Sequence, residues 1–202
     1  SDRTWVDRND LDCAVRFHGQ DQILLNSQGS LVSTIDFLQF EKQGWDRIVQ
    51  SYESFFANVT AHSIEPLLKL AKAGAGDHIL DVACGTGDLT AYATKIGASA
   101  IGVDIAPAMV KRATYLHPGI PFVIGDAEHL PFLDNRFDAV VCNLGIGHFP
   151  RPESAFAEFV RLAKSGGRIA LSWWSPPAEN SFLGLFFEAI RDSKAPVSDE
   201  LP

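Results

Sequence analysis

The chain has 202 residues, of which 46% are hydrophobic and 21% charged, which is typical of one globular domain and argues against general disorder or a coiled coil. The net charge of -8 disfavours nucleic acid as a partner, because proteins that bind it displace counterions with clustered Lys and Arg. The charged first residues form no secretory signal and no apolar run is long enough for a membrane span, so we expect a cytoplasmic protein.

The N-terminal part is predicted to consist of an arm and a helical cap. The arm covers residues 1–44, where QILLNSQGSLVSTIDF fits either a hairpin that turns at Ser27 to Gly29 or an extended arm. The helical cap covers residues 45–75 and precedes the sheet. Its first helix is indicated by apolar side chains at helical spacing, at Trp45, Ile48, Val49, Tyr52 and Phe56, and its second helix is expected from about Ala61 to Ala73.

From residue 76 onward, apolar runs of strand length alternate with stretches of helical length, which predicts a parallel sheet with crossover helices. The runs are continuously apolar, as expected for strands covered on both faces. Strands are predicted at residues 78–82, 99–103, 121–124, 137–143 and 167–173, and helices at 88–96, 107–116 and 153–163. The expected fold class is therefore α/β, with one domain over residues 45–202.

The first strand leads into a glycine turn, HILDVACGTGDLTAYA, at the sheet edge where open parallel sheets bind ligands. Gly85 and Gly87 let the backbone come close to a ligand, and a helix that starts near Asp88 directs free N–H groups toward it, which suits a carboxylate. A dinucleotide fingerprint would have a third glycine where this chain has Thr90, which weakens that interpretation. The loop alone is also compatible with a purely structural turn.

Acidic residues follow the next two strands. Asp104 ends the second strand and can accept hydrogen bonds from both hydroxyls of a ribose, although it would equally cap the helix that begins near Pro107. Asp126 follows the third strand and can accept a hydrogen bond from an adenine amine, while the amide of Ala127 or Glu128 reads a ring nitrogen. Three strand ends would then contact one ligand that contains a nucleoside.

Four segments agree in order and spacing with one known family: DVACGTG, GVDIAPAMV, GDAEHLPF and FDAVVCNLGIGHFPRPESAFAEFVRLAKSGGRI. Over about residues 52–174 the chain resembles the class I S-adenosylmethionine-dependent methyltransferases, particularly the branch of quinone-biosynthesis methyltransferases. The resemblance implies a Rossmann-like three-layer sandwich with a mostly parallel sheet, and S-adenosylmethionine as cofactor. The family's usual Lys-Pro-Gly-Gly before the fifth strand is replaced by residues 164–167, KSGG, a departure that affects a turn and not the cofactor site.

The resemblance also implies which residues bind the cofactor. The implied set is Asp81, Ala83, Gly85, Thr86 and Gly87 around the methionine part, Asp104 on the ribose, Ile105, Met109, Gly125, Asp126 and Ala127 around the adenine, Asn143 and Leu144 beneath the sulfonium, and Tyr52 from the cap.

A sulfonium is already an activated methyl donor, so the protein must mainly align an acceptor and exclude water. His148 follows the fourth strand and is the candidate general base, and packing at the helix that begins near Pro152 is its alternative role. Phe56, Trp173 and Trp174, together with His148, are the candidate acceptor contacts, although helically spaced aromatic residues are also common in cores. We expect methyl transfer to a small, apolar or aromatic molecule.

Motifs that the sequence lacks narrow the class of methyl acceptor. The fourth strand does not end in the Asn/Asp-Pro-Pro-aromatic motif that methylates base amines, and neither carboxylates nor Cys13, Cys84 and Cys142 have metal-ligand spacing. The alternatives are a cofactor-binding regulatory module or pseudoenzyme and, less favoured, a nicotinamide-dependent oxidoreductase. Because the family usually adds two strands after the fifth, we expect a fragment or a sheet completed from elsewhere, with a homodimer through the N-terminal arm or the exposed sheet edge as one route.

Overall fold

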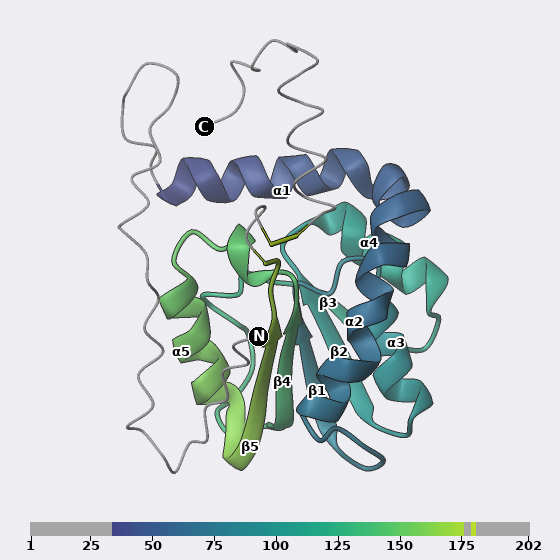
Figure 1. The fold of residues 1–202 in the computed structure, drawn as a ribbon. Coiled ribbons are helices and arrows are strands. Elements are labelled where there is room, and N and C mark those ends of the chain that lie inside the picture. Colours follow the sequence, from purple (N-terminus) through teal and green to yellow (C-terminus); the bar gives the residue numbers. More distant parts are fainter. Residues whose placement is uncertain (1–33, 176–178, 181–202) are drawn as a thin grey trace.

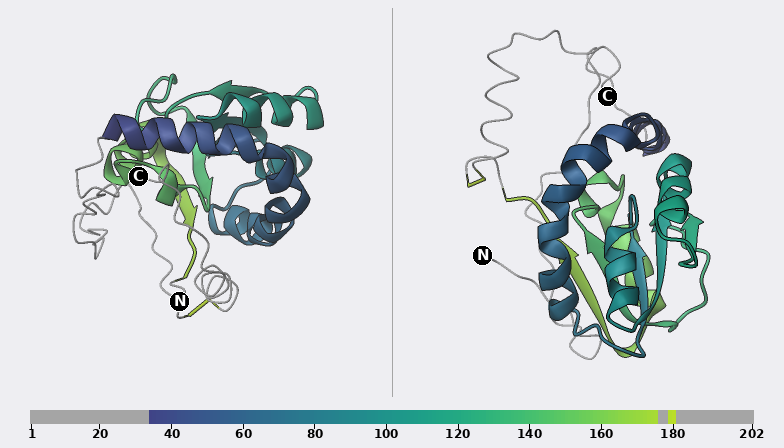
Figure 2. Two further views of the ribbon diagram at one scale, coloured as in Figure 1. Left: turned by 90° about the horizontal axis from the view of Figure 1, so that it is seen from above. Right: turned by 90° about the vertical axis from the view of Figure 1, so that its right-hand side faces the viewer.

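The computed structural model describes residues 34–175 and 179–180, which form a three-layer α/β domain (Figures 1 and 2). All strand pairs are parallel and the sheet order is β3-β2-β1-β4-β5. The strands are β1 (His78–Val82), β2 (Ser99–Asp104), β3 (Phe122–Ile124), β4 (Phe137–Asn143) and β5 (Ala163–Ser172), and the helices between them are α3 (Asp88–Lys95), α4 (Pro107–Leu116), the short η2 (Ile146–His148) and α5 (Pro152–Leu162). From β1 the chain builds the sheet outward through β2 to β3, and it then crosses back to place β4 and β5 on the other side of β1. Open α/β sheets bind ligands at such a switch point, which here lies between β1 and β4.

The continuously apolar strands are buried on both faces, as their sequence predicts. On one face, α3 and the helix α2 (Ala57–Leu70) cover a cluster that contains Ile79 and Val141. On the other face, α5 packs through the buried Phe159 against Leu80 and Val140. Alternate residues of one strand thus enter opposite cores, which explains why β1 and β4 show no polar alternation.

The N-terminal segment is one helical run rather than the two separate helices predicted from the sequence. The helix α1 (Thr34–Ser51) passes through a π-helical turn, η1 (Tyr52–Phe56), directly into α2. The run starts at Thr34, ahead of the predicted start at Trp45, and the rest of the segment assigned to a hairpin or an extended arm lies outside the described residues. Figure 1 shows α1 lying across the carboxyl ends of the strands, while α2 descends along one face of the sheet. We call the run of residues 34–70 the cap.

The predicted strand boundaries are close to the observed ones except at β5. Pro121 accepts a hydrogen bond from the Gly102 N–H but has no N–H of its own to donate, so β3 begins one residue later, at Phe122. The fifth strand begins at Ala163, before its predicted start, because Ala163 already pairs with Phe137 of β4, and the pairing resumes only at Arg168 after a shift in register. The residues that replace the family's Lys-Pro-Gly-Gly therefore form a bulge inside β5. None of the described helices is long and apolar enough to cross a lipid bilayer.

Candidate active site

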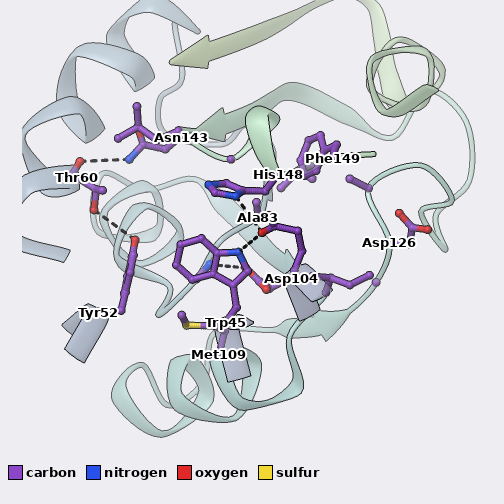
Figure 3. A pocket seen from close by; sticks show the side chains of 18 of the residues that line it. Trp45, Tyr52, Thr60, Ala83, Asp104, Met109, Asp126, Asn143, His148 and Phe149 are labelled. Atoms are coloured by element: carbon purple, nitrogen blue, oxygen red, sulfur yellow. Dashed lines mark hydrogen bonds and ion pairs between the residues drawn. The ribbon is translucent and has the colours of Figure 1, made fainter. Parts of the chain in front are cut away.

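A cavity of about 400 Å³ lies at the carboxyl ends of the strands and beneath α1 (Figure 3). Its sheet side consists of residues at the carboxyl ends of β1, β2 and β4 and in the segments that follow the strands, and its cap side consists of residues from α1, η1 and the start of α2. The sheet side comprises Val82, Ala83, Gly85, Asp104, Ile105, Met109, Gly125, Asp126, Ala127, Asn143, Leu144, Gly145, His148, Phe149, Pro150 and Trp174, and the cap side comprises Leu38, Glu41, Trp45, Tyr52, Phe56 and Thr60.

The loop after β1 brings backbone rather than side chains to the cavity. Ala83, Gly85 and Gly87 all have positive φ angles, of 58°, 53° and 87°, and this tight turn leads into α3. Gly85 lines the cavity, whereas Gly87 lies behind the loop, where an added Cβ would meet the Phe122 ring at 2.6 Å. The two glycines therefore have different roles: one leaves room on the ligand side, and the other allows the loop to pack on the sheet.

Asp104 joins this loop to the end of β2. Its Oδ2 accepts a hydrogen bond from the Gly85 N–H at 2.8 Å and its Oδ1 accepts one from the Ala106 N–H at 2.9 Å. The side chain is 8% exposed, and burial raises its pKa against the lowering effect of these two amides and of His148. A carboxylate offers about four acceptor positions, so two remain for hydroxyl groups of a molecule in the cavity.

The loop after β3 presents Gly125, Asp126 and Ala127 to the cavity and is held from behind. The Asp126 Oδ1 accepts a hydrogen bond from the Glu128 N–H at 2.9 Å, and the buried Glu128 carboxylate accepts hydrogen bonds from the Arg151 backbone N–H and Nε at 2.8 and 2.7 Å. These contacts fix the direction of a second carboxylate near that of Asp104.

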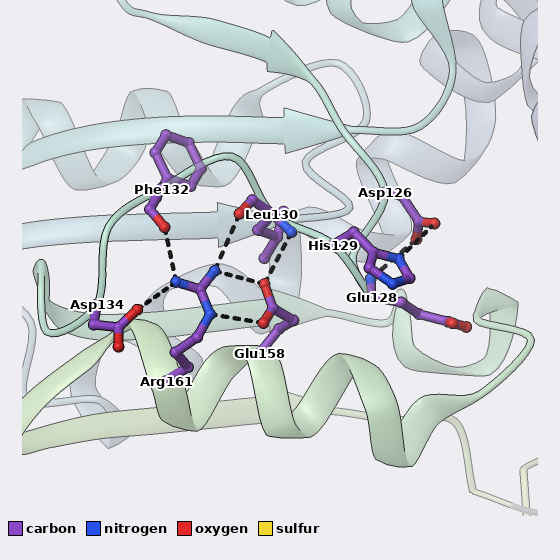
Figure 4. A network of polar contacts seen from close by, with 8 residues as sticks. All are labelled: Asp126, Glu128, His129, Leu130, Phe132, Asp134, Glu158 and Arg161. Carbon is purple, nitrogen blue, oxygen red and sulfur yellow. Dashed lines mark hydrogen bonds and ion pairs between the residues drawn. The ribbon is translucent and has the colours of Figure 1, made fainter.

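A second network supports the same loop (Figure 4). The Arg161 guanidinium donates to both Glu158 oxygens at 2.7 Å and to the Leu130 and Phe132 carbonyl oxygens at 3.1 and 2.8 Å. The Glu158 Oε2 in turn accepts a hydrogen bond from the Leu130 N–H at 3.0 Å. This network clamps residues 130–132 onto α5 and thereby anchors the segment that follows Asp126.

Aromatic side chains dominate the cap side. Tyr52 and Phe56 stack with ring centroids 6.4 Å apart, and Trp45 meets Tyr52 edge-on at 5.8 Å. The Tyr52 hydroxyl lies 3.5 Å from Thr60 Oγ1, and burial raises the pKa of this phenol. An added Cβ at Gly85 would lie 3.6 Å from the same hydroxyl, so Tyr52 reaches the glycine loop across the cavity.

His148 meets the cap at the opposite end of the cavity. Its Nδ1 lies 3.0 Å from Glu41 Oε2, which also accepts a hydrogen bond from Trp45 Nε1 at 2.9 Å. The Trp45 ring stands edge-on to the imidazole, with centroids 5.0 Å apart. Figure 3 shows Trp45 and His148 side by side in the cavity.

Comparison with known proteins identifies the domain. Residues 80–171 match the model of a methyltransferase domain. A demethylmenaquinone methyltransferase of Renibacterium salmoninarum is 35% identical over 115 residues, which are 57% of this chain and 48% of that protein. The solved YcgJ protein of Bacillus subtilis is 31% identical, with a TM-score of 0.53 over 64% of this chain and 57% of its own. A TehB-like SAM-dependent methyltransferase of Corynebacterium glutamicum is 25% identical, with a TM-score of 0.52 over 71% of this chain and 81% of its own.

Residues 80–171 are thus similar to a methyltransferase domain, and the fold is the one found in class I methyltransferases. The chain spans about half the length of the similar demethylmenaquinone methyltransferases, and its five parallel strands with flanking helices are the Rossmann-like arrangement expected from the sequence.

Most residues assigned to the cofactor by resemblance line one cavity of the methyltransferase domain. Three do not: Asp81, Thr86 and Gly87 lie behind the loop. The Asp81 Oδ2 accepts a hydrogen bond from the buried Thr90 hydroxyl at 2.6 Å, while its Oδ1 has no partner among the described residues. Burial raises the Asp81 pKa to about 7. Asp81 and Thr90 thus occupy the space between loop, sheet and α3, where a dinucleotide fingerprint has its third glycine.

Asn143 and Leu144 line the cavity, but the Asn143 amide is already occupied by protein partners. Its Oδ1 accepts hydrogen bonds from the Ser63 and Ser172 hydroxyls at 2.7 and 2.6 Å, and its Nδ2 donates to the Thr60 carbonyl at 3.2 Å. Asn143 therefore connects α2 of the cap to the ends of β4 and β5.

The candidate acceptor residues separate into two groups. Phe56, His148 and Trp174 line the cavity, whereas Trp173 is 60% exposed and packs over Gly147, outside it. The sequence interpretation did not include several lining residues, namely Leu38, Glu41, Thr60, Val82, Gly145, Phe149 and Pro150. The spacing of Leu38, Glu41 and Trp45 is helical and could have extended the cap toward the N-terminus.

The arrangement fits S-adenosylmethionine, the donor that this family implies. Asp104 and Asp126 offer carboxylate oxygens at the ends of two neighbouring strands, and the apolar Ile105 and Met109 line the same cavity. Hydroxyl and amine donors separated by a flat ring are the features of an adenosine. The described residues contain no cluster of His, Cys, Asp or Glu that could hold a metal ion.

Proposed function

We propose that the protein binds S-adenosylmethionine on the sheet side of the cavity and transfers its methyl group to a small, apolar or aromatic acceptor beneath the cap. The observation that carries this proposal is the joint placement of Asp104, Asp126 and the Gly85 backbone around one cavity. The two carboxylates account for recognition of a nucleoside. The similarity to methyltransferases is the reason to expect that this nucleoside is part of a methyl donor.

Different residues of the sheet side would bind different parts of the cofactor. We assign the ribose hydroxyls to Asp104, the adenine amine to Asp126 with the neighbouring Ala127 amide, and the ring faces to Ile105 and Met109. The methionine part is assigned to the backbone at Ala83 and Gly85, which line the cavity. When bound, the cofactor supplies a methyl group on a sulfonium sulfur, which keeps the electron pair of the broken bond as a neutral thioether.

The acceptor is assigned to the cap side, where Phe56, Phe149 and Trp174 offer apolar and aromatic contact. His148 is the proposed general base, because it is the histidine that lines this cavity. The similarity to demethylmenaquinone methyltransferases suggests a reduced quinone as the first acceptor to test.

Calorimetric titration with S-adenosylmethionine and with its demethylated product tests the cofactor assignment. Binding of both ligands, with loss of binding in Asp104→Ala, is expected. No binding by the wild-type protein would overturn the assignment. Methyl transfer from labelled cofactor to 1,4-naphthohydroquinone, and then to extracts of the source organism with identification of the product by mass, separates an enzyme from a regulatory module or pseudoenzyme that only binds.

A nicotinamide cofactor is disfavoured by Thr90, whose fully buried hydroxyl is bonded to Asp81 in the place of a close-packing glycine. A fluorescence titration with NADH is expected to show no binding. The cytoplasmic location, the exclusion of nucleic acid and the homodimer remain predictions, and sedimentation of the full protein tests the last of these.

A further inference from the structure

Glu41 lies at an unusual place for a carboxylate. It projects from α1 into a cavity with mostly apolar walls, and its side chain is only 14% exposed. One of its oxygens, Oε2, is shared by Trp45 Nε1 at 2.9 Å and His148 Nδ1 at 3.0 Å. Glu41 and His148 are 107 positions apart in the sequence and meet only because the cap crosses the ends of the strands (Figure 1).

The cap does not depend on this contact for its attachment. The Asp46 Oδ1 accepts a hydrogen bond from the Ala108 N–H at the start of α4, at 2.8 Å. Glu53 forms two hydrogen bonds with the Arg112 guanidinium, each 2.7 Å long. Since a mostly buried carboxylate loses hydration, its presence where the cap is already anchored indicates a role toward the cavity.

The contact fixes the tautomer of His148. A carboxylate only accepts hydrogen bonds, so the imidazole must donate its proton from Nδ1, which leaves a lone pair on Nε2. The described residues give Nε2 no hydrogen-bond partner. Free imidazole side chains favour the opposite tautomer, with the proton on Nε2. The edge-on Trp45 ring, 5.0 Å from the imidazole, further restricts rotation of the ring.

We infer that Glu41 is a positioning residue that holds His148 as a proton acceptor for the methyl acceptor. The inference rests on the proposed function and gives the acceptor a chemical class: a molecule with a hydroxyl group that must lose its proton. The acceptor O–H bond breaks, the proton joins His148 Nε2, and the electron pair stays on the acceptor oxygen. The imidazolium that forms is then paired with the Glu41 carboxylate.

One consequence is that the His148–Glu41 pair is assembled from two parts of the fold. The imidazole comes from the segment after β4 and its orienting carboxylate comes from α1. The proton acceptor is therefore complete only when the cap lies over the sheet.

The test uses three variants of the full chain. Glu41→Gln keeps an oxygen that can accept the Nδ1 proton but removes the charge. Glu41→Leu removes both. Glu53→Gln is the matched control, because it removes a carboxylate that anchors the cap outside the cavity. The His148 tautomer is read from the ¹⁵N NMR shifts of histidine-labelled protein, with the peaks assigned by comparison with His148→Gln.

The expected pattern is specific to a positioning role. Wild type, Glu41→Gln and Glu53→Gln carry the proton on Nδ1, whereas Glu41→Leu shifts toward the Nε2 form. With 1,4-naphthohydroquinone as acceptor, kcat falls by about 100-fold in Glu41→Leu, at the lower end of general-base effects, and by about tenfold in Glu41→Gln, which keeps an acceptor for the Nδ1 proton. The acceptor KM and the cofactor Kd change little.

Two results would overturn the inference: an unchanged tautomer in Glu41→Leu, or a kcat in that variant equal to that of Glu53→Gln. A parallel loss of cofactor affinity in Glu41→Leu would also count against it, since that marks a structural role of Glu41 in closing the cap. If wild type binds no S-adenosylmethionine, the proposed function fails, but the tautomer comparison still decides whether Glu41 positions His148.

Discussion

The two sides of the cavity are built differently. On the sheet side, Asp104 and Asp126 are held by backbone amides of adjacent loops, and the residues behind them are buried in the core. On the cap side, α1 and η1 contain no fully buried residue among those whose exposure is described. Their contacts with the rest of the domain include the edge of the Trp45 ring on His148 and polar contacts of Glu41, Asp46 and Glu53. This difference indicates that the proposed donor site, on the sheet side, is preorganised by the sheet, whereas the proposed acceptor site, on the cap side, depends on a separately attached helix.

The largest effect is expected at Asp104, the centre of the sheet side. Asp104→Ala removes the acceptor for the ribose hydroxyls and leaves the Gly85 and Ala106 amides without a partner. We expect the Kd for S-adenosylmethionine to rise about 1000-fold, about 4 kcal/mol, from the loss of two hydrogen bonds to a charged group. Calorimetry measures this, and Asp88→Asn, outside the cavity, is the control. An affinity within threefold of wild type in Asp104→Ala would show that the sheet side is not the donor site.

The next effect concerns the buried support of the sheet side. Asp81 has a pKa of about 7 in the folded protein because of burial, and a value near 3.8 in the unfolded chain. The folded state therefore binds the Asp81 proton more tightly than the unfolded chain does. This preference stabilises the fold below about pH 4, and the stabilisation is lost as the pH rises from about 4 through about 7. Between pH 5 and pH 8, Asp81→Asn should gain about 3 kcal/mol of unfolding free energy relative to wild type.

Urea unfolding at the two pH values measures the effect of Asp81→Asn. Asp138→Asn is the opposite case: burial opposes ionisation of Asp138, but hydrogen bonds from Lys164 and the His78 amide outweigh it and lower the pKa. The stability that Asp138 contributes is complete above its unfolded pKa, so its variant should show no change relative to wild type between pH 5 and 8. An equally flat profile for Asp81→Asn would contradict the raised pKa.

The connection between the two sides can be broken at Asn143. Asn143→Ala removes one hydrogen bond to the Thr60 carbonyl and the acceptor of two hydroxyls, of which Ser172 is left without an acceptor while Ser63 keeps the Thr60 carbonyl at 2.7 Å. We expect the free energy of unfolding to fall by about 2 kcal/mol, as measured by urea unfolding. Ser63→Ala, which removes only one of the three bonds, should cost less than half as much. Equal losses in the two variants would mean that Asn143 does not join the cap to the sheet.

The smallest effect is expected at Ala83, where the loop of the sheet side adopts a left-handed conformation with φ of 58°. A residue with a Cβ is strained there, and glycine is not. Ala83→Gly should raise the free energy of unfolding by about 0.5 to 1 kcal/mol. Ala91→Gly, in the helix α3, is the control and should lower it. A loss of stability in Ala83→Gly would show that the Ala83 methyl group is needed for packing against Gly145.

These two sides also differed in how much the sequence could predict. The sheet side follows from local patterns: continuous apolar runs mark the strands, and the residues at their ends, such as Gly85, Asp104 and Asp126, meet because parallel strands end at one edge. The cap side does not follow from local patterns, because the pairing of Glu41 with His148 joins residues far apart in the sequence. The π-helical turn also leaves no simple periodicity, and the bulge in β5 depends on pairing with β4.

The π-helical turn at Tyr52–Phe56 has a consequence for how this cap tolerates change in length. The turn closes with a hydrogen bond from the Ala57 N–H to the Tyr52 carbonyl, one residue wider than in an α-helix. Deleting a single residue there would restore an ordinary α-helix with little rotation of α1 relative to α2, because the π-helical turn holds one residue more than an α-helical turn over nearly the same rotation and rise. By contrast, deleting one residue of α1 between Trp45 and Ser51 would rotate Glu41 and Trp45 by about 100° around the helix axis and away from His148, although every side chain of the site remained in the sequence. The cap should therefore tolerate the loss of one residue within the π-helical turn but not within this part of α1.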